Sequence, residues 1–368
     1  MKVLMAGGGT AGHINPAIAI AKHIRSKHPD AEVRFVGTHR GMEEDLVKKE
    51  GFPIDFIDIR GFKRKLTLYN LGSIKAVFTS QKEARDLLDA FRPDVVIGTG
   101  GYVSWPILHN AAKRGIPTAI HEQNAFPGLT TRMLSKEVDV VMISFDAVRP
   151  KLDKCRRIEL TGNPIREEVI FADSVKAKES LGMTDKPIVL SFAGSLGARV
   201  MNENFISFIT KTCADRKFYH IHATGTRGYL WVPDKLKEAG FDAGEYPDVQ
   251  VKEYIYNMPE LLAAADVVVC RSGAITLSEL AAQGKCAILV PSPNVTNDHQ
   301  NYNARAFSDI GAAKIIDESN LSGDLLKSEI YALLDDPEKR REMGEKARTL
   351  AVLDSNERIY ETVKSILK

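Results

Sequence analysis

Residues 191–199 read Ser-Phe-Ala-Gly-Ser-Leu-Gly-Ala-Arg, and they follow an apolar run from Pro187 that is typical of a buried strand. From Val200 onward, apolar side chains recur at helical spacing. A strand, a glycine turn and a helix form an anion site, because the backbone can approach a ligand and unpaired N–H groups of the first helical turn point at it. The stretch predicts a pocket for a nucleoside diphosphate; a tight turn without a ligand is the alternative.

Length and composition indicate a globular chain of two domains. The chain has 368 residues, which is too long for one ordinary core. Its composition, 44% hydrophobic and 27% charged, is typical of a globular protein. A formal net charge of +2 argues against a general nucleic-acid binder. The four cysteines form no Cys-x-x-Cys pair, so reduced cytoplasmic thiols are expected. Without a signal sequence or an apolar run of roughly 18 residues, the chain is expected to be neither secreted nor membrane-spanning.

A similar strand, turn and helix opens the chain. Residues 7–13 read Gly-Gly-Gly-Thr-Ala-Gly-His and match Gly-x-Gly-x-x-Gly. A nicotinamide-binding domain should carry an acid at the end of the next strand to hold the ribose, but the strand at 32–38 ends without one. The turn is therefore predicted to bind phosphate rather than a dinucleotide. His13, at the positive end of the helix, is expected to be neutral and able to accept a proton; a histidine that only occupies the helix start is the alternative.

Alternating strands and helices in the first half predict a doubly wound parallel sheet. Ligands bind such sheets at the carboxyl ends of the strands. Residues 99–102, Thr-Gly-Gly-Tyr, and residues 121–124, His-Glu-Gln-Asn, each follow a predicted strand. We therefore expect Glu122 and Asn124 beside the same crevice as His13.

A basic segment with apolar residues lies between two of these strands. Residues 60–66 read Arg-Gly-Phe-Lys-Arg-Lys-Leu, so that Phe62 stands among Lys63, Arg64 and Lys65. This mixture favours contact with an anionic membrane surface, to which each cation contributes on the order of 1 kcal/mol. A solvated charged loop is the alternative.

The second half starts after a Gly-Asn-Pro turn at residues 162–164 and repeats the arrangement of the first. Arg166, beside this turn, is expected to contact phosphate or to form an ordinary surface ion pair. Glu279 lies early in a helix after a buried strand, where it could accept hydrogen bonds from a ribose diol or simply cap the helix. The polar loop at 290–301 carries amides, which suit sugar hydroxyls.

Together these motifs resemble the bacterial cell-wall N-acetylglucosaminyltransferases of glycosyltransferase family 28. The matching stretches are residues 7–13, 61–64, 97–103, 121–124, 161–166, 194–198, 271–274 and 298–304. The resemblance implies a GT-B fold, in which two Rossmann-like, doubly wound parallel-sheet domains face each other across a deep cleft. It implies an N-terminal acceptor domain of residues 1–163 and 352–368 and a C-terminal donor domain of residues 164–351, with the final helix crossing back.

The implied reaction is inverting transfer of N-acetylglucosamine from UDP-N-acetylglucosamine to the C4 hydroxyl of the N-acetylmuramyl group of undecaprenyl-linked lipid I. The product would be β-1,4-linked lipid II for peptidoglycan synthesis, made on the cytoplasmic face of the bacterial cell membrane by a peripheral enzyme. One displacement needs one base, for which His13 is expected and Glu122 is the second choice. Because the sequence contains no Asp-x-Asp, neither a metal nor a cofactor is expected.

Matching motifs also imply binding residues. The donor is expected to contact Thr10, Gly12, Asn124, Arg166, Ser195, the backbone of Ile255, Glu279 and Gln300. The acceptor diphosphate is expected to contact Gly8, Gly9, Gly100, Gly101 and Tyr102. The alternatives are a related lipid glycosyltransferase with another nucleotide sugar, an NAD-dependent oxidoreductase, which would leave Glu279 without a role, and a membrane adaptor, which would explain only residues 60–71.

Overall fold

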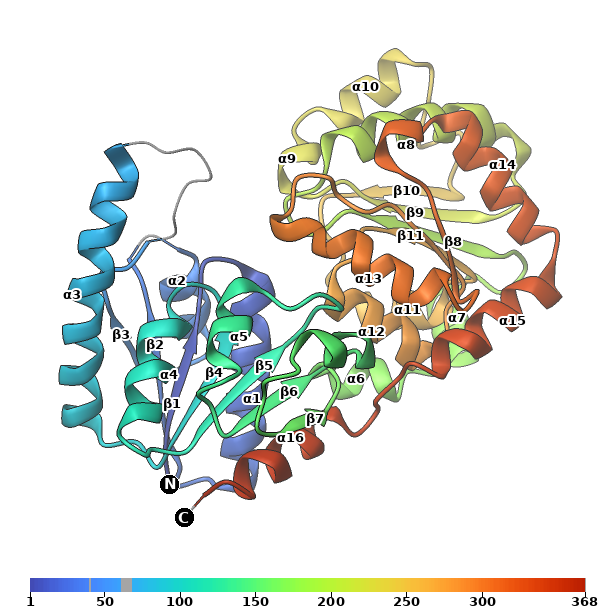
Figure 1. Cartoon of the computed structure of the whole chain (residues 1–368). Coiled ribbons are helices and arrows are strands. Elements are labelled where there is room, and N and C mark those ends of the chain that lie inside the picture. The colour runs from blue at the N-terminus through green and yellow to red at the C-terminus, as the bar shows by residue number, and fades with distance from the viewer. Residues whose placement is uncertain (40, 61–67, 368) are drawn as a thin grey trace. The chain divides into compact units, whose positions relative to one another are not determined.

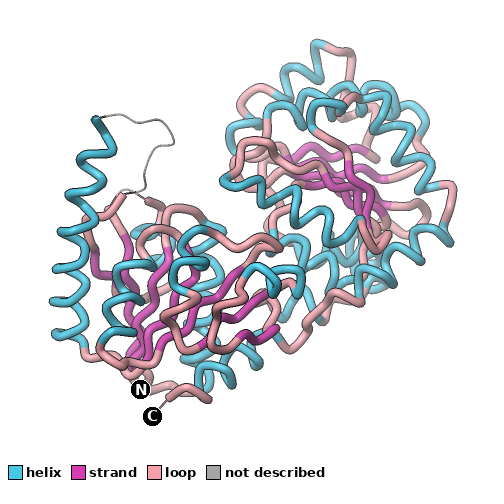
Figure 2. The backbone as a smooth tube through the Cα atoms, in the orientation of Figure 1, coloured by secondary structure: helices cyan, strands magenta, loops and turns pink. Residues whose placement is uncertain are grey.

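The computed structural model describes residues 1–39, 41–60 and 68–367. Contacts divide the chain into two compact units, a first of Met1–Ile165 with Val352–Lys368 and a second of Arg166–Ala351. In each unit, parallel strands form a sheet enclosed by helices (Figures 1 and 2).

The first unit contains a seven-stranded parallel sheet in the order β3-β2-β1-β4-β5-β6-β7. Its strands are β1 (Lys2–Gly7), β2 (Glu32–Gly37), β3 (Ile54–Phe56), β4 (Val95–Gly100), β5 (Thr118–Glu122), β6 (Val140–Ile143) and β7 (Ile158–Leu160). The strand order reverses between β1 and β4. In open sheets of this kind, ligands bind outside the carboxyl ends of the strands at such a reversal.

Helices cover this sheet on both faces. They are α1 (Ala11–Lys27), α2 (Glu43–Lys49), α3 (Leu68–Phe91), α4 (Ser104–Lys113), α5 (Leu129–Leu134) and α16 (Ser355–Lys364). On α1, Ile14, Ala17, Ala21 and Ile24 recur at intervals of three and four residues, so they form one face of the helix, which is buried in the core with β1. The buried face of α1 thereby fixes where the turn between β1 and α1 lies.

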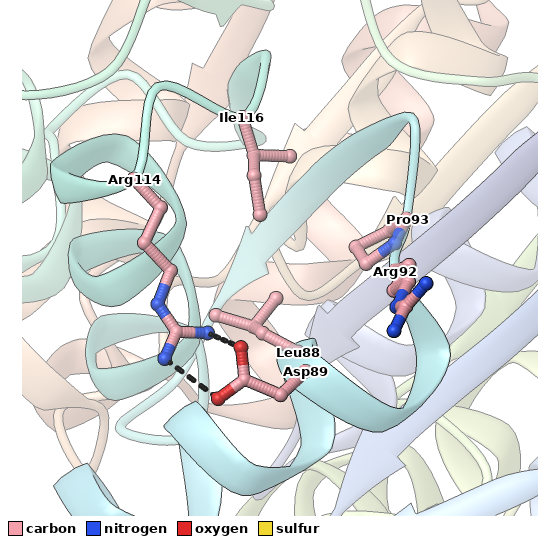
Figure 3. Close-up of a pocket in the computed structure, with 6 residues that line it drawn as sticks. All are labelled: Leu88, Asp89, Arg92, Pro93, Arg114 and Ile116. Carbon is pink, nitrogen blue, oxygen red and sulfur yellow. Dashed lines mark hydrogen bonds and ion pairs between the residues drawn. The ribbon is translucent and has the colours of Figure 1, made fainter.

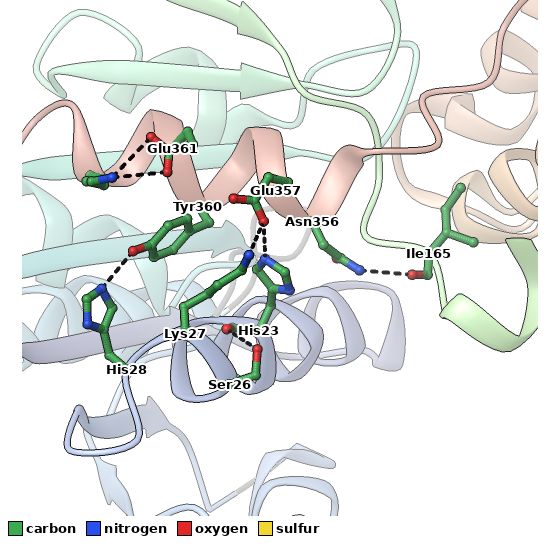
Figure 4. Close-up of polar contacts among 10 residues, drawn as sticks. His23, Ser26, Lys27, His28, Ile165, Asn356, Glu357, Tyr360 and Glu361 are labelled. Atoms are coloured by element: carbon green, nitrogen blue, oxygen red, sulfur yellow. Dashed lines mark hydrogen bonds and ion pairs between the residues drawn. The ribbon is translucent and has the colours of Figure 1, made fainter.

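The helix α16 belongs to the first unit although it follows the second unit in the sequence. Its side chains in the core of the first unit are Ile359, Tyr360 and Val363. Polar contacts also join α16 to the end of α1 (Figure 4): the Tyr360 hydroxyl lies 2.7 Å from Nε2 of His28, the C-cap residue, and Lys27 donates to Glu357 at 2.8 Å. The chain therefore enters the first unit a second time to complete its core.

The second unit contains a six-stranded parallel sheet in the order β10-β9-β8-β11-β12-β13. Its strands are β8 (Ile188–Phe192), β9 (Tyr219–Ala223), β10 (Val249–Lys252), β11 (Val267–Cys270), β12 (Ala287–Leu289) and β13 (Ala313–Ile315). The order reverses between β8 and β11, so the stretch 191–199 leaves the sheet at its reversal point. The prediction of two doubly wound parallel sheets is confirmed.

The helices of the second unit are α6 (Glu167–Ile170), α7 (Ser174–Leu181), α8 (Arg199–Thr212), α9 (Thr226–Tyr229), α10 (Val232–Glu238), α11 (Met258–Ala264), α12 (Ala274–Gln283), α13 (His299–Ser308), α14 (Gly323–Leu334) and α15 (Pro337–Arg348). α8 packs against α10 and α14, and α12 packs against α6 and α15. Fully buried Phe205 and Phe208 of α8 anchor the core beneath the turn that precedes this helix.

Two buried histidines lie in this core. The Ser191 hydroxyl lies 2.8 Å from Nε2 of His220 and 2.7 Å from Nδ1 of His222, and Nε2 of His222 lies 3.1 Å from Oδ1 of Asn202. Both imidazoles are about 1% exposed. Burial lowers the pKa of His222 to about 3 and that of His220 well below its ordinary value. Both rings are therefore neutral at physiological pH.

We expect the protein to lose stability as the pH falls below about 6.5, the pKa of unfolded histidine. The unfolded chain takes up a proton there, whereas folded His222 does so only near pH 3, so His222 alone costs roughly 2 kcal/mol of unfolding free energy between pH 7.5 and pH 5. Urea unfolding at both pH values measures this loss. It should shrink by that amount in His222→Asn and stay unchanged in the control His39→Asn, whose imidazole is exposed. Equal losses in wild type and His222→Asn would contradict it.

Candidate functional site

The glycine turns after β1 and β4 touch each other at the reversal point of the first sheet. The ladder shifts register after Ala6, so that Gly7 pairs with Gly100, and the Gly8 N–H lies 3.4 Å from the Gly100 carbonyl oxygen. A Cβ on Gly101, whose φ is +78°, would lie 2.3 Å from the carbonyl oxygen of Gly8, so only glycine fits there.

Tyr102 also belongs to this cluster, because its ring would lie 3.6 Å from a Cβ on Gly9. Thr10 stands at the N-cap position of α1, and Gly12 is in its first turn. The structure therefore brings together the residues expected to bind the acceptor diphosphate, along with Thr10 and Gly12.

A buried carboxylate that sequence reasoning missed supports the first turn. The Gly9 N–H donates to Oε1 of Glu43 at 2.8 Å, and Glu43, at the start of α2, is fully buried. A Cβ on Gly8 would lie 2.1 Å from the same oxygen. Glu43 therefore holds the turn in place and occupies one of its amides. Its only sequence signal is an acid at a helix start, which is too common to indicate this contact.

His13 lies where this turn enters α1. Its Nδ1 is 2.9 Å from the carbonyl oxygen of Thr99 and 3.2 Å from Oε1 of Gln123. Both partners only accept hydrogen bonds, so in the neutral form of the ring Nδ1 carries the proton and Nε2 has the lone pair. Nε2 has no hydrogen-bond partner among the described residues. A neutral imidazole in this tautomer can act as a general base.

Glu122, the second candidate base, is engaged within its own loop. Its Oε1 accepts from the backbone N–H and the side-chain amide of Asn124, both at 3.2 Å. Its Oε2 accepts from the Gly128 N–H at 2.9 Å and from the Thr131 hydroxyl at 2.6 Å. These hydrogen bonds tie the carboxylate to the start of α5. Of the two candidates, the geometry favours His13.

In the second unit, the turn after β8 is open at Gly194, where a Cβ would meet no atom within 4 Å. A Cβ on Gly197, whose φ is +77°, would lie 1.9 Å from the carbonyl oxygen of Thr224, so the loop after β9 packs directly on this turn. Ser195 is exposed at the turn, and its carbonyl oxygen accepts from the Thr226 N–H. Ala198 at the N-cap position of α8 has no side chain that could accept from the first helical amides. These amides can therefore receive an anion.

Arg166 forms an ion pair, which was one of the two expectations for it, but its partner Glu279 was not predicted from the sequence. Nη2 and Nε of Arg166 donate to Oε1 of Glu279 at 2.8 and 3.2 Å. The Arg166 side chain is 51% exposed, whereas that of Glu279 is 11% exposed. Burial raises the pKa of Glu279, and Arg166 opposes that shift. Arg166 stands at the N-cap position of α6, and Glu279 lies in α12, the helix that follows β11.

Gln300 lies in the first turn of α13, and Ile255 lies in the loop between β10 and α11 of the same unit. Gln300 Oε1 accepts from the Ser292 N–H at 2.8 Å, and its carbonyl oxygen accepts from the Ser272 hydroxyl at 2.8 Å. The hydrogen bond from Ser292 orients the side-chain amide of Gln300 so that its NH2 group can donate to a ligand. Ile255 is 3% exposed, so its side chain is buried in the unit.

One cavity of the first unit lies away from the candidate site. A cavity of about 460 Å³ in the first unit lies where β4 and β5 begin, at the opposite edge of the sheet from the glycine turns. Its lining residues are Leu88, Asp89, Arg92, Pro93, Arg114 and Ile116 (Figure 3).

In the described part of the chain, no cluster of three or more His, Cys, Asp or Glu side chains could hold a metal ion.

The residues expected to meet a membrane, Phe62, Lys63, Arg64 and Lys65, lie outside the described residues. In α3, which follows them in the sequence, Phe78 is 74% exposed. Over the ranges that the structure covers, no helix has both the length and the apolar composition needed to span a bilayer.

Two family models match the chain. The glycosyltransferase family 28 N-terminal domain matches residues 3–143, and the family 28 C-terminal domain matches residues 188–359. The chain belongs to glycosyltransferase family 28. The family 28 N-terminal domain model matches residues within the first unit. The family 28 C-terminal domain model matches most of the second unit and continues into α16.

Full-length relatives agree with this membership. The chain is 46% identical over 369 residues to the UDP-N-acetylglucosamine--N-acetylmuramyl-(pentapeptide) pyrophosphoryl-undecaprenol N-acetylglucosamine transferase of Acetivibrio thermocellus, covering 100% of this chain and 99% of that protein. It is 44% identical over 367 residues to the transferase of the same name from a Thermoanaerobacter species, covering both chains fully. The crystal structure of Acinetobacter baumannii MurG matches with a TM-score of 0.78 and 30% identity over 99% of each chain. The family 28 resemblance and the GT-B fold are confirmed.

Proposed function

We propose that this family 28 glycosyltransferase moves N-acetylglucosamine from UDP-N-acetylglucosamine to the C4 hydroxyl of the N-acetylmuramyl group of lipid I, giving lipid II for peptidoglycan synthesis. The observation that carries the proposal is the 46% identity, over the whole chain, to a relative named for this transfer. The tautomer of His13 supports it, because the reaction needs one base.

In the proposed reaction, the acceptor hydroxyl oxygen bonds to the anomeric carbon while the bond from that carbon to the UDP oxygen breaks. Nε2 of His13 takes the hydroxyl proton, and the α linkage of the donor becomes a β linkage. The resulting imidazolium is stabilised by its two acceptors, the Thr99 carbonyl and Gln123 Oε1. The glycine turns at residues 7–12 and 98–101 hold the acceptor diphosphate.

The donor is assigned mainly to the second unit, and Thr10, Gly12 and Asn124 of the first unit are its remaining expected contacts. Glu279 Oε1 holds Arg166, which leaves Oε2 for the ribose hydroxyls, while Arg166 and the turn at Ser195 hold the diphosphate. The Ile255 backbone meets the uracil, and Gln300 and Asn124 meet the sugar hydroxyls. The negative charge that develops on departing UDP is stabilised by Arg166 and by the first amides of α8.

A transfer assay tests the proposal. We expect label to pass from UDP-N-acetylglucosamine to a lipid I analogue in a β-1,4 linkage. Unlabelled UDP-glucose and UDP-N-acetylgalactosamine should compete poorly. Transfer from one of these sugars in preference would establish the alternative, a related lipid glycosyltransferase with another donor. No transfer from any of them would refute the proposal.

Membrane association at the cytoplasmic face is part of the proposal. Changing Lys63, Arg64 and Lys65 to Glu should weaken binding to vesicles of anionic phospholipid by at least about 100-fold, because each cation contributes roughly 1 kcal/mol. Sedimentation with vesicles measures this. A matched control changes the exposed Lys217, Lys235 and Lys237 of the second unit to Glu and should bind as wild type does. Equal partitioning of both variants would contradict the assignment.

A further inference from the structure

A chain of buried side chains leads from the edge of the first unit to His13. Nε2 of His121 lies 2.9 Å from the carbonyl oxygen of Gly162, and the Gln123 amide nitrogen lies 3.0 Å from Nδ1 of His121. Oε1 of Gln123 then lies 3.2 Å from Nδ1 of His13. His121 is 0% exposed and Gln123 is 2% exposed. Toward His13, Gln123 acts only as a hydrogen-bond acceptor.

The proton positions along this chain follow from its first member. A carbonyl can only accept, so Nε2 of His121 carries a proton, and burial lowers the pKa of His121, which keeps the ring neutral. Nδ1 of His121 is then an acceptor and requires the NH2 group of Gln123. That group also donates to the His121 carbonyl at 3.0 Å. The Gln123 oxygen is consequently turned toward His13.

The opposite orientation of the Gln123 amide is excluded by its neighbours. A flipped amide would place its oxygen against two acceptors of His121 and its NH2 group against the N–H of His13. The loop around it is also fixed, because Asn163 donates to the Gln123 carbonyl at 3.1 Å and the Ser144 hydroxyl donates to Asn163 at 2.9 Å. Every link therefore runs in one direction.

We propose that Gln123, oriented by His121, is a positioning residue that keeps His13 in the tautomer with Nδ1 protonated and Nε2 free to accept a proton. The role of Nε2 rests on the proposed function, whereas the tautomer itself does not. The Thr99 carbonyl accepts the same proton, so loss of Gln123 weakens the preference of His13 for this tautomer but does not invert it.

Histidine 15N NMR tests the tautomer without any substrate. Long-range 1H–15N spectra of labelled protein at pH 8, with His13 assigned by its absence in His13→Ala, should show Nδ1 protonated. In Gln123→Met both tautomers should be populated, and kcat should fall about tenfold with little change in donor KM. The control Asn110→Leu removes another buried amide of this unit and should change neither tautomer nor kcat.

The outcomes separate the two proposals. Wild-type His13 with Nε2 protonated would overturn the positioning role whether or not the protein transfers sugar. An unchanged tautomer and kcat in folded Gln123→Met would overturn it as well. Absence of transfer by the wild type would instead refute the proposed function, and the NMR result would still decide the tautomer.

Discussion

Replacing His13 by alanine is expected to lower kcat by a factor of about 10² to 10⁴, the range that general-base catalysis supplies. The affinity for UDP should stay unchanged, because UDP is assigned to the second unit and His13 belongs to the first. Removal of the imidazole leaves the acceptor hydroxyl without a group to take its proton. Steady-state transfer rates and calorimetric titration with UDP measure the two quantities.

A matched control for His13 lies on the same helix. His23 of α1 faces Glu357 of α16, with its Nε2 3.2 Å from that carboxylate. His23→Ala should therefore reduce stability slightly and leave kcat as it is. Near-normal turnover in His13→Ala, with His23→Ala behaving alike, would show that another group takes the proton.

Replacing Glu279 by alanine is expected to weaken UDP binding by about 3 kcal/mol, roughly 100-fold. Hydrogen bonds to a charged acceptor are worth about 1.5–3 kcal/mol each, and a carboxylate can accept from both ribose hydroxyls. The Glu279 side chain is 11% exposed, so water replaces these bonds poorly. Calorimetric titration measures the loss.

The ion pair with Arg166 requires a second comparison. Wild-type protein should bind UDP much more tightly than 2′,3′-dideoxy-UDP, and Glu279→Ala should bind both alike. Arg166→Gln should weaken both ligands, because it loses a contact to the diphosphate, and should still discriminate between them. If Glu279→Ala discriminated as well as Arg166→Gln does, the carboxylate would serve only to hold the arginine.

The fold and the backbone parts of the site were predictable because their signals are local. The glycine turns at 7–12 and 194–197 each stand between a strand and a helix in the sequence, and the alternation around them indicates parallel sheets. Parallel strands carry their carboxyl ends to one edge, so the meeting of Gly8 with Gly101 followed from topology.

The pairing of side chains at the candidate site of each unit could not be predicted in the same way. Arg166 and Glu279 are 113 positions apart, and His13 and Gln123 are 110 apart. No spacing rule links such pairs, because the loops between strands set their approach. Glu43 is a similar case, since its burial beside Gly9 depends on how α2 packs. The sequence shows which groups gather at the edge and leaves open which of them bond.

The return of the chain through α16 sets an order for folding during synthesis. Residues 166–351 form a continuous unit that can fold once they have left the ribosome. The first unit is made earlier, yet its core lacks Ile359, Tyr360 and Val363 until residues 355–364 have been translated. The unit that is synthesised first is therefore completed last, and a nascent chain stalled before residue 355 should hold a finished second unit behind an unfinished first one.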